Sequence, residues 1–305
     1  MVIIDTLHWI WITKMKINEN NIMYQSMMLN NNHKINYVTQ GQGEPIVLVH
    51  GLAASLHDWD DLLPELSDAG YQSFALDLLG HGESEKPKDI NQYTFQAVYD
   101  NFANWLDSLN ITKPFPLIGH SLGAALCLQY TYLHPGKISS LILVNPFYDA
   151  HQLSATIRMF FRTPLLKTNF LELTPYRLFR FFVDLSSFNF YIGQRESHSL
   201  PEHIRYQTAL DYMRASTGIY NIPHTLPDLS GQLVMLHQPT LLLYGARDQT
   251  LSTKSFLNLT KFITNVKGIH SFDLCGHVPH QCHPEKFNPH VMEFLKSYGV
   301  NQLAD

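Results

Sequence analysis

Cysteine is scarce in this chain of 305 residues. The three cysteines, Cys127, Cys275 and Cys282, are odd in number and do not form a disulfide framework. This excludes a small secreted fold held together by disulfides and favours a reducing compartment. We therefore expect a cytoplasmic protein.

Charge is also low, since Asp, Glu, Lys and Arg together make up 15% of the residues. The net charge of −5 provides no basic excess for nucleic acid, so no nucleic-acid partner is expected. A hydrophobic content of 45% argues against disorder and supports a sizeable core. The 17 histidines include no closely spaced set with cysteines and carboxylates that resembles a metal cage, so we expect no metal.

The N-terminus lacks the features of a targeting or membrane-spanning segment. Residues 1–16 are apolar but interrupted by polar side chains, and they are fewer than the ~20 residues that a spanning helix needs. No basic start or small-residue cleavage site marks a secretory signal. We interpret residues 1–22 as an N-terminal extension, with Met15 and Met23 as alternative starts and membrane-surface contact as an alternative role.

Strand and helix patterns alternate along most of the chain, which is typical of a mostly parallel sheet covered on both faces. Strand patterns occur at residues 24–29, 34–39, 45–50, 71–76, 116–118, 141–145, 240–245 and 268–274. Helical patterns occur at residues 58–66, 94–109, 122–134, 253–263 and 284–298. Pro114 and Pro116 flank one strand start, and because proline cannot donate to a ladder we expect that strand to begin late. The predicted class is α/β, with an eight-stranded, mostly parallel sheet.

The alternation stops between the sixth and seventh of these strands. That stretch contains short helical patterns rich in Phe, Arg and Leu, such as residues 175–185 and 202–215. We interpret it as a helical cap inserted into the core. The predicted organisation is an extension at residues 1–22, a core at 23–146 and 233–305, and a cap at 147–232.

The most informative motif is Gly119-His120-Ser121-Leu122-Gly123, between a strand pattern and a helix pattern. A Gly-x-Ser-x-Gly at such a junction predicts a nucleophile elbow. The tight turn requires small residues two positions before and after the serine, and glycine occupies both. The helix that follows favours negative charge developing at its N-terminus. Ser121 is therefore the candidate nucleophile.

A serine hydroxyl needs a base, and the base needs a group that orients it. The acid candidate is Asp248, just beyond a strand, because ligands sit at the carboxyl edge of a parallel sheet. Asp149 is its rival, whereas Asp77 lies in a glycine loop and is assigned a structural role.

The base candidate is His277, which directly follows Gly276 after the last strand. His280 and His283 are its rivals. The chain thus supplies serine, aspartate and histidine in the order found with nucleophile elbows.

An oxyanion hole would use two backbone amides. We assign them to Leu122, which follows the nucleophile, and to Leu52 in the loop after the strand ending at His50. His50 itself is interpreted as a residue that braces this loop.

With these motifs, the chain resembles the α/β-hydrolase superfamily over residues 25–298, in its serine esterase and lipase-like branch with a helical cap. The matching motifs are His50-Gly51-Leu52, Asp77-Leu78-Leu79-Gly80-His81-Gly82, Gly119-His120-Ser121-Leu122-Gly123, Gly245-Ala246-Arg247-Asp248 and Gly276-His277. Related dehalogenases and epoxide hydrolases carry Asp where Ser121 stands. The pattern also departs from the Gly-x-Ser-Met-Gly-Gly form of many C–C bond hydrolases at Leu122 and Ala124.

The cap segment contains nine of the 18 phenylalanines. One interpretation is an apolar tunnel for an acyl or aryl group, with Phe160, Phe161, Phe181 and Phe182 as pocket residues. The alternative is that these rings only seat the cap on the core. Interleaved arginines are also compatible with contact at a lipid interface.

The resemblance and the motifs predict a serine hydrolase, of the carboxylesterase or acylglycerol lipase-like kind, that cleaves carboxylic esters of small molecules through an acyl-enzyme, with no metal and no cofactor. Alternatives on the same residues are a C–C bond hydrolase, a cofactor-free perhydrolase and a ligand-binding protein without activity. The sequence gives no indication of the oligomeric state.

Overall fold

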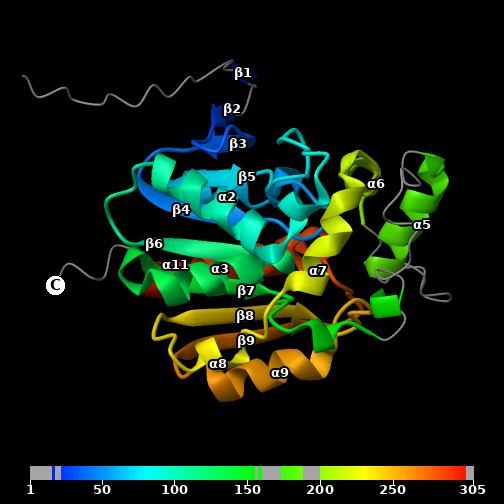
Figure 1. The fold of residues 1–305 in the computed structure, drawn as a ribbon. Helices are drawn as coiled ribbons and strands as arrows, with labels where there is room; N and C mark the ends of the chain where they lie inside the picture. The colour runs from blue at the N-terminus through cyan, green and yellow to red at the C-terminus, as the bar shows by residue number, and fades with distance from the viewer. Residues whose placement is uncertain (1–15, 18–21, 155–156, 160–172, 188–199, 300–305) are drawn as a thin grey trace, which may run out of the picture.

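The computed structural model describes residues 16–17, 22–154, 157–159, 173–187 and 200–299. One mixed sheet in the order β1-β2-β3-β5-β4-β6-β7-β8-β9 runs through the molecule (Figure 1). Its strands are β1 (Lys16–Ile17), β2 (Met23–Met28), β3 (Lys34–Gln40), β4 (Glu44–Val49), β5 (Tyr71–Leu76), β6 (Phe115–His120), β7 (Ile138–Val144), β8 (Thr240–Gly245) and β9 (Val266–Phe272). The pairs β1–β2, β2–β3 and β3–β5 are antiparallel, and the remaining pairs, from β5–β4 to β8–β9, are parallel.

Helices cover both faces of the sheet. The α-helices are α1 (Leu63–Asp68), α2 (Phe95–Ser108), α3 (Leu122–Leu133), α5 (Tyr176–Ser186), α6 (Glu202–Arg214), α7 (Ile222–Thr225), α8 (Ser230–Leu233), α9 (Thr253–Phe262), α10 (Pro279–Cys282) and α11 (Pro284–Tyr298). Short 3₁₀ helices are η1 (Leu56–Trp59), η2 (Ile90–Tyr93), η3 (Pro135–Lys137), η4 (Ala150–Gln152) and η7 (Thr217–Asn221). Figure 1 shows α2 and α3 in front of the sheet and α11 behind it.

The central strands are apolar on both sides because each faces two cores. On β4, Val47 and Val49 belong to the core beneath α2 and α3, whereas Ile46 and Leu48 belong to the core beneath α1 and α11. This alternation follows from the two-residue period of a strand. It explains why these strands have continuous apolar runs rather than an alternating pattern.

The predicted eight-stranded, mostly parallel sheet is confirmed as β2 to β9. A ninth strand, β1, lies in the stretch interpreted as an extension and pairs antiparallel with β2. The expected late start of β6 is wrong, because β6 begins at Phe115. Its register with β7 shifts between Phe115 and Leu117, so the ladder accommodates Pro116 as a local irregularity.

The segment between β7 and β8 contributes η4, α5, α6, η7, α7 and α8 to the described structure. Figure 1 shows α5 and α6 beyond one end of the sheet, to the right of the strands. Phe179 and Val183 form the buried side of α5, in the same core as α1 and α11. In the part of the chain described here, no helix combines the length and the apolar character needed to cross a bilayer.

Candidate active site

Ser121 lies at the turn between β6 and α3 with a positive φ of 51°. A Cβ at Gly119 would come within 2.7 Å of the Ala124 backbone, and one at Gly123 would meet the carbonyl oxygen of Val49. Only glycine fits at both positions, so the strained turn is held by close packing on either side. The Gly-x-Ser-x-Gly spacing therefore has a direct steric cause.

The structure brings Ser121, His277 and Asp248 together from three separate loops. Nε2 of His277 lies 2.9 Å from Oγ of Ser121, and Nδ1 of His277 lies 2.7 Å from Oδ2 of Asp248. A carboxylate can only accept, so Nδ1 carries the hydrogen and the lone pair of Nε2 faces the hydroxyl. This is the arrangement in which a histidine can take a proton from serine.

Asp248 is held as an anion by donors on both carboxylate oxygens. Burial alone would raise the pKa of Asp248, but the adjacent His277 and further hydrogen bonds lower it below its ordinary value. The backbone amides of Thr250 and Leu251 donate to Oδ1 at 2.7 and 3.0 Å. Nδ2 of Asn145 donates to Oδ2 at 2.7 Å. The sequence reasoning missed Asn145, although its position at the end of β7 was a usable signal.

The backbone of His277 is anchored from two directions. Its amide donates to the carbonyl oxygen of Ser186 at 2.8 Å, at the end of α5. Its own carbonyl oxygen lies 2.9 Å from Nε2 of His120, the residue before the nucleophile. The insertion and the elbow thus both position the loop that carries His277.

The two residues assigned to an oxyanion hole, Leu52 and Leu122, lie beside Ser121 along one cavity. A Cβ at Gly51 would lie 3.2 Å from Cβ of Ser121, so the chain passes close to the nucleophile there. Ala53 has a positive φ of 64° and turns the loop away again. The amide of Leu122 is the first of α3, where amides have no partner within the helix.

Two nearby motif residues have structural contacts. Nε2 of His50 accepts a hydrogen bond from the Leu78 amide at 3.0 Å, which braces the loop after β4 as expected. Asp77 accepts hydrogen bonds from the Leu56 amide and the Glu83 amide at 2.8 and 2.9 Å. These contacts agree with the structural role assigned to Asp77.

The rival acid and base candidates lie in other environments. Asp149 caps the short helix η4 and accepts from the His151 amide at 3.0 Å. His280 lies 3.7 Å from Asp58, and His283 lies 3.5 Å from Glu285. The structure therefore pairs Ser121 with His277 rather than with either neighbouring histidine.

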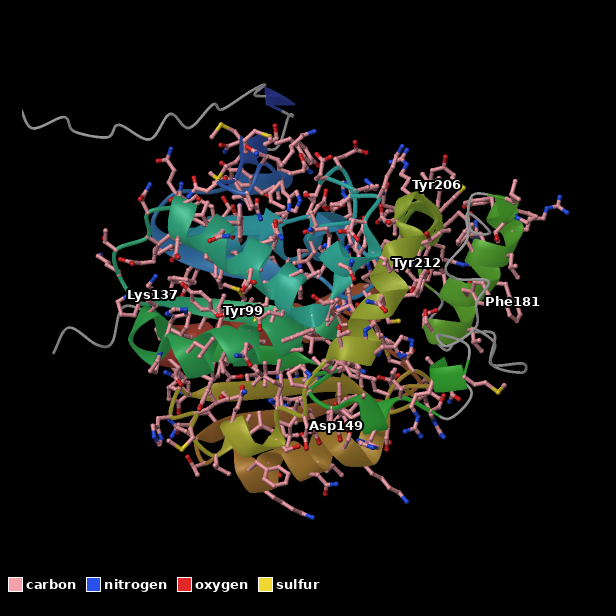
Figure 2. The ribbon with its side chains drawn as sticks, in the orientation of Figure 1. Tyr99, Lys137, Asp149, Phe181, Tyr206 and Tyr212 are labelled. Carbon is pink, nitrogen blue, oxygen red and sulfur yellow. The ribbon has the colours of Figure 1, made fainter. Side chains whose placement is uncertain are left out.

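A mostly apolar cavity of about 490 Å³ opens beside Ser121 and His277. Of the four predicted pocket residues, Phe182 lines it. Phe181 does not line it among the described residues; its side chain is 48% exposed on the outer side of α5 (Figure 2). Phe160 and Phe161 lie outside the described residues. Further lining residues that sequence reasoning did not identify include Phe179, Tyr212, Tyr220 and Leu251.

Within the described ranges, one group of three side chains has the spacing for a metal ion. A carboxylate oxygen of Asp58 and ring nitrogens of His120 and His280 lie within 4.8 Å of one another, and all three residues are buried. A hydrogen-bond contact of 3.2 Å already joins Asp58 to His120. We interpret the group as a hydrogen-bonded cluster.

Comparison with known proteins is consistent with this geometry. The chain matches the family described as alpha/beta hydrolase fold over residues 44–283. The chain belongs to this family. Among curated relatives, a cis-3-alkyl-4-alkyloxetan-2-one decarboxylase of Shewanella oneidensis is 26% identical, with 87% of this chain and 86% of the relative aligned. The family match therefore covers most of the chain.

Other relatives show how broad the α/β-hydrolase family is. A 2-hydroxy-6-oxo-6-(2'-aminophenyl)hexa-2,4-dienoic acid hydrolase of Metapseudomonas resinovorans is 23% identical, covering 85% of this chain and 86% of that protein. The solved esterase of Exiguobacterium antarcticum has a TM-score of 0.74 at 20% identity, covering 89% of this chain and 98% of that one. The latter likeness shows the shared fold.

Proposed function

We propose that the protein is a serine hydrolase that cleaves carboxylic esters through an acyl-enzyme. The observation that carries this proposal is the continuous contact from Asp248 through His277 to Oγ of Ser121, at the wall of an apolar cavity. A serine in this setting differs from an ordinary buried serine because a neutral imidazole accepts its hydrogen.

Each described residue then has a chemical role. Ser121 attacks the ester carbonyl while His277 takes its proton, and Asp248 holds the imidazole and stabilises its charged form. The amides of Leu52 and Leu122 stabilise the oxyanion. His277 next protonates the leaving alcohol, and a water molecule repeats the sequence to release the acid.

The cavity supports an uncharged, apolar acyl or aryl substrate. Its volume of about 490 Å³ lies within the range of small-molecule sites. The cavity wall includes Phe179 and Phe182 from α5 and Tyr212 from α6, so the insertion acts as a cap that completes the site. Cys127, Cys275 and Cys282 are free, buried thiols, which supports a cytoplasmic location.

A C–C bond hydrolase on the same residues is the second candidate, since the Metapseudomonas relative is a hydrolase of a 6-oxo-dienoic acid. The acid named for that relative has a carboxylate. The walls of the cavity described here are mostly aromatic and aliphatic, which favours the ester.

A chain-length series of p-nitrophenyl esters tests the proposal. If the cavity receives the acyl group, each added methylene should raise kcat/KM by up to about fourfold until the cavity is full. Phe182→Ala should shift the preferred chain length, because Phe182 lines the cavity. Phe181→Ala is the matched control on the next residue, and its half-exposed side chain should leave the preference unchanged. Absence of ester hydrolysis, with turnover of a vinylogous diketone instead, would replace the ester by the C–C substrate.

A further inference from the structure

A buried polar cluster lies directly behind the proposed catalytic histidine. It comprises Asp58 of η1, His120 at the end of β6, and His280 and Gln281 of α10, all of them buried. The ring of His120 lies 4.9 Å from that of His277 between centroids, and 4.6 Å from that of His280. The proposed mechanism gives these four residues no task.

His120 faces a hydrogen-bond acceptor at each ring nitrogen. Nε2 lies 2.9 Å from the carbonyl oxygen of His277, and Nδ1 lies 3.2 Å from Oδ2 of Asp58. A neutral imidazole has one N–H and would turn a lone pair toward one of these oxygens. With Asp58 ionised, both contacts are favourable only if each nitrogen of His120 carries a hydrogen.

Asp58 is placed to hold the compensating negative charge. Nε2 of Gln281 donates to its Oδ1 at 3.0 Å, and Nε2 of His280 lies 3.7 Å from Oδ2. Burial alone would raise the pKa of Asp58, but His120 and His280 hold it below its ordinary value. Burial lowers the pKa of His120 to about 4, although Asp58 opposes that effect. Against this lowering we set the two acceptors, because removing the extra proton leaves one of them without a hydrogen bond in a site without solvent.

We propose that His120 is a positioning residue: paired as an imidazolium with the Asp58 carboxylate, it donates from Nε2 to the His277 carbonyl and fixes the catalytic loop against the elbow. The inference rests on the proposed function of Ser121 and His277. Because His120 immediately precedes Ser121, this hydrogen bond connects the nucleophile and the base through one residue.

The pair also acts electrostatically on the proposed base. Its positive end faces His277 on one side, and the Asp248 carboxylate faces His277 on the other. The titratable groups that face His120 are Asp58 from η1, His280 from α10 and His277 from the loop after β9. Neutralising the pair should therefore move the acidic limb of the pH–rate profile to higher pH.

The protonation of His120 can be measured without any substrate. In protein labelled with ¹⁵N-histidine, both ring nitrogens of His120 should carry hydrogen at pH 7.5, with the resonances assigned through His120→Gln. A lone-pair nitrogen on His120 at this pH would overturn the ion pair. One equivalent of bound zinc that is lost in Asp58→Asn would overturn it as well, because a metal would then supply the positive charge.

Paired substitutions separate positioning from a merely structural role. His120→Asn keeps a group near Asp58 but removes the donor to His277, and should lower kcat roughly 10- to 100-fold with KM within about threefold. His120→Gln restores a donor near the Nε2 position and should recover most of that loss. Equal losses in both variants would contradict the proposal.

Asp58→Asn tests the effect of the ion pair's charge. The new asparagine amide can donate to Nδ1 of a neutral His120, while Nε2 of His120 still donates to the His277 carbonyl. The midpoint of the acidic limb should rise by roughly half to one pH unit, whereas an unchanged midpoint would overturn the electrostatic effect. Asp60→Asn is the control, because Asp60 is an exposed acid two residues away.

If either single variant fails to fold, the double variant Asp58→Asn/His120→Gln, in which both residues are uncharged, replaces it. If Ser121 of the unsubstituted protein does not react with a fluorophosphonate, the proposed function fails, and the ¹⁵N measurement still decides whether the ion pair exists.

Discussion

Two histidine–aspartate pairs lie side by side in this molecule, and their surroundings give them different chemistry. His277 and Asp248 are 2.7 Å apart, and His120 and Asp58 are 3.2 Å apart. Nε2 of His277, the nitrogen that does not contact the carboxylate, faces the hydroxyl of Ser121, which can donate a hydrogen bond. Nε2 of His120 instead faces the carbonyl oxygen of His277, which can only accept one.

This difference shows that the partner of the second nitrogen decides what a buried histidine–carboxylate pair can do. In its neutral form, His277 has a lone pair toward Ser121 that can accept the hydroxyl proton. His120 has no lone pair to offer in our account, so it can only hold a neighbouring group in place. In our proposal, similar residues in contact therefore supply a base and an anchor.

A third buried carboxylate completes the comparison because, among the described residues, its hydrogen-bond partners include no histidine. Asp211 of α6 accepts from the Ser55 hydroxyl at 2.8 Å and from Gln207 at 2.9 Å. Burial raises the pKa of Asp211 to about 7, opposite to the direction for Asp58 and Asp248. An imidazole partner thus reverses the effect of burial on a carboxylate.

The largest expected effect comes from neutralising the proposed catalytic pair, Asp248 and His277. Asp248→Asn should lower kcat by roughly 10⁴-fold, because an amide can hold the imidazole in the wrong tautomer. His277→Gln should abolish turnover. The matched control is Asp149→Asn, which removes a carboxylate that caps η4 and has no contact with His277 among the described residues. A loss in the control as large as in Asp248→Asn would transfer the role of the acid to Asp149.

The pH dependence of the rate distinguishes the two pairs next. Because His277 must be neutral, kcat/KM should rise along a single limb with a midpoint in the neutral range, and fall roughly tenfold per unit below it. The lowered pKa of Asp248 keeps this carboxylate ionised throughout that range. A rate that is flat from about pH 5 to 8 would contradict a histidine base.

The smallest effect concerns stability and the third carboxylate. With a pKa of about 7 in the folded protein and ~3.9 when unfolded, Asp211 binds protons better in the folded state. Its contribution to the free energy of unfolding therefore falls as the pH rises from about 4 to 7, and stays low above that. Asp211→Asn should raise the free energy of unfolding by roughly 1 to 3 kcal/mol at pH 8 and by much less at pH 4.

Denaturant unfolding of both proteins at pH 8 and pH 4 gives this difference. Asp58 and Asp248 have lowered pKa values, so their contributions have the opposite sign and are lost as the pH falls below about 4. A variant that is less stable than the unsubstituted protein at pH 8 would show that Asp211 is stabilised as an anion.

Local pattern was enough to predict much of the core. Residues 71–76 and 240–245 were predicted as strands and form β5 and β8 with these bounds. Both runs are mostly apolar and are bounded by turn residues, although β5 includes the polar Gln72 and Ser73. The elbow was predictable because its steric demands fall on adjacent residues.

The remaining features depend on contacts between distant residues. The strand β1 is two residues long and pairs with the edge strand β2. Two residues are too few to show a strand pattern in the sequence. Asp58 and His120 are 62 positions apart, and Asn145 and Asp248 are 103 apart. Phe181 and Phe182 are neighbours of the same type, so only the rotation of α5 decides which one faces the cavity.

Covalent labelling of the nucleophile tests the central claim most directly. Incubation with a fluorophosphonate should add one phosphonyl group per chain, mapped to Ser121 by peptide mass spectrometry. Ser121→Ala should remain unlabelled and keep its fold, with kcat lowered by roughly 10⁴- to 10⁶-fold. Labelling that persists at full extent in Ser121→Ala would contradict the assignment of Ser121 as the nucleophile.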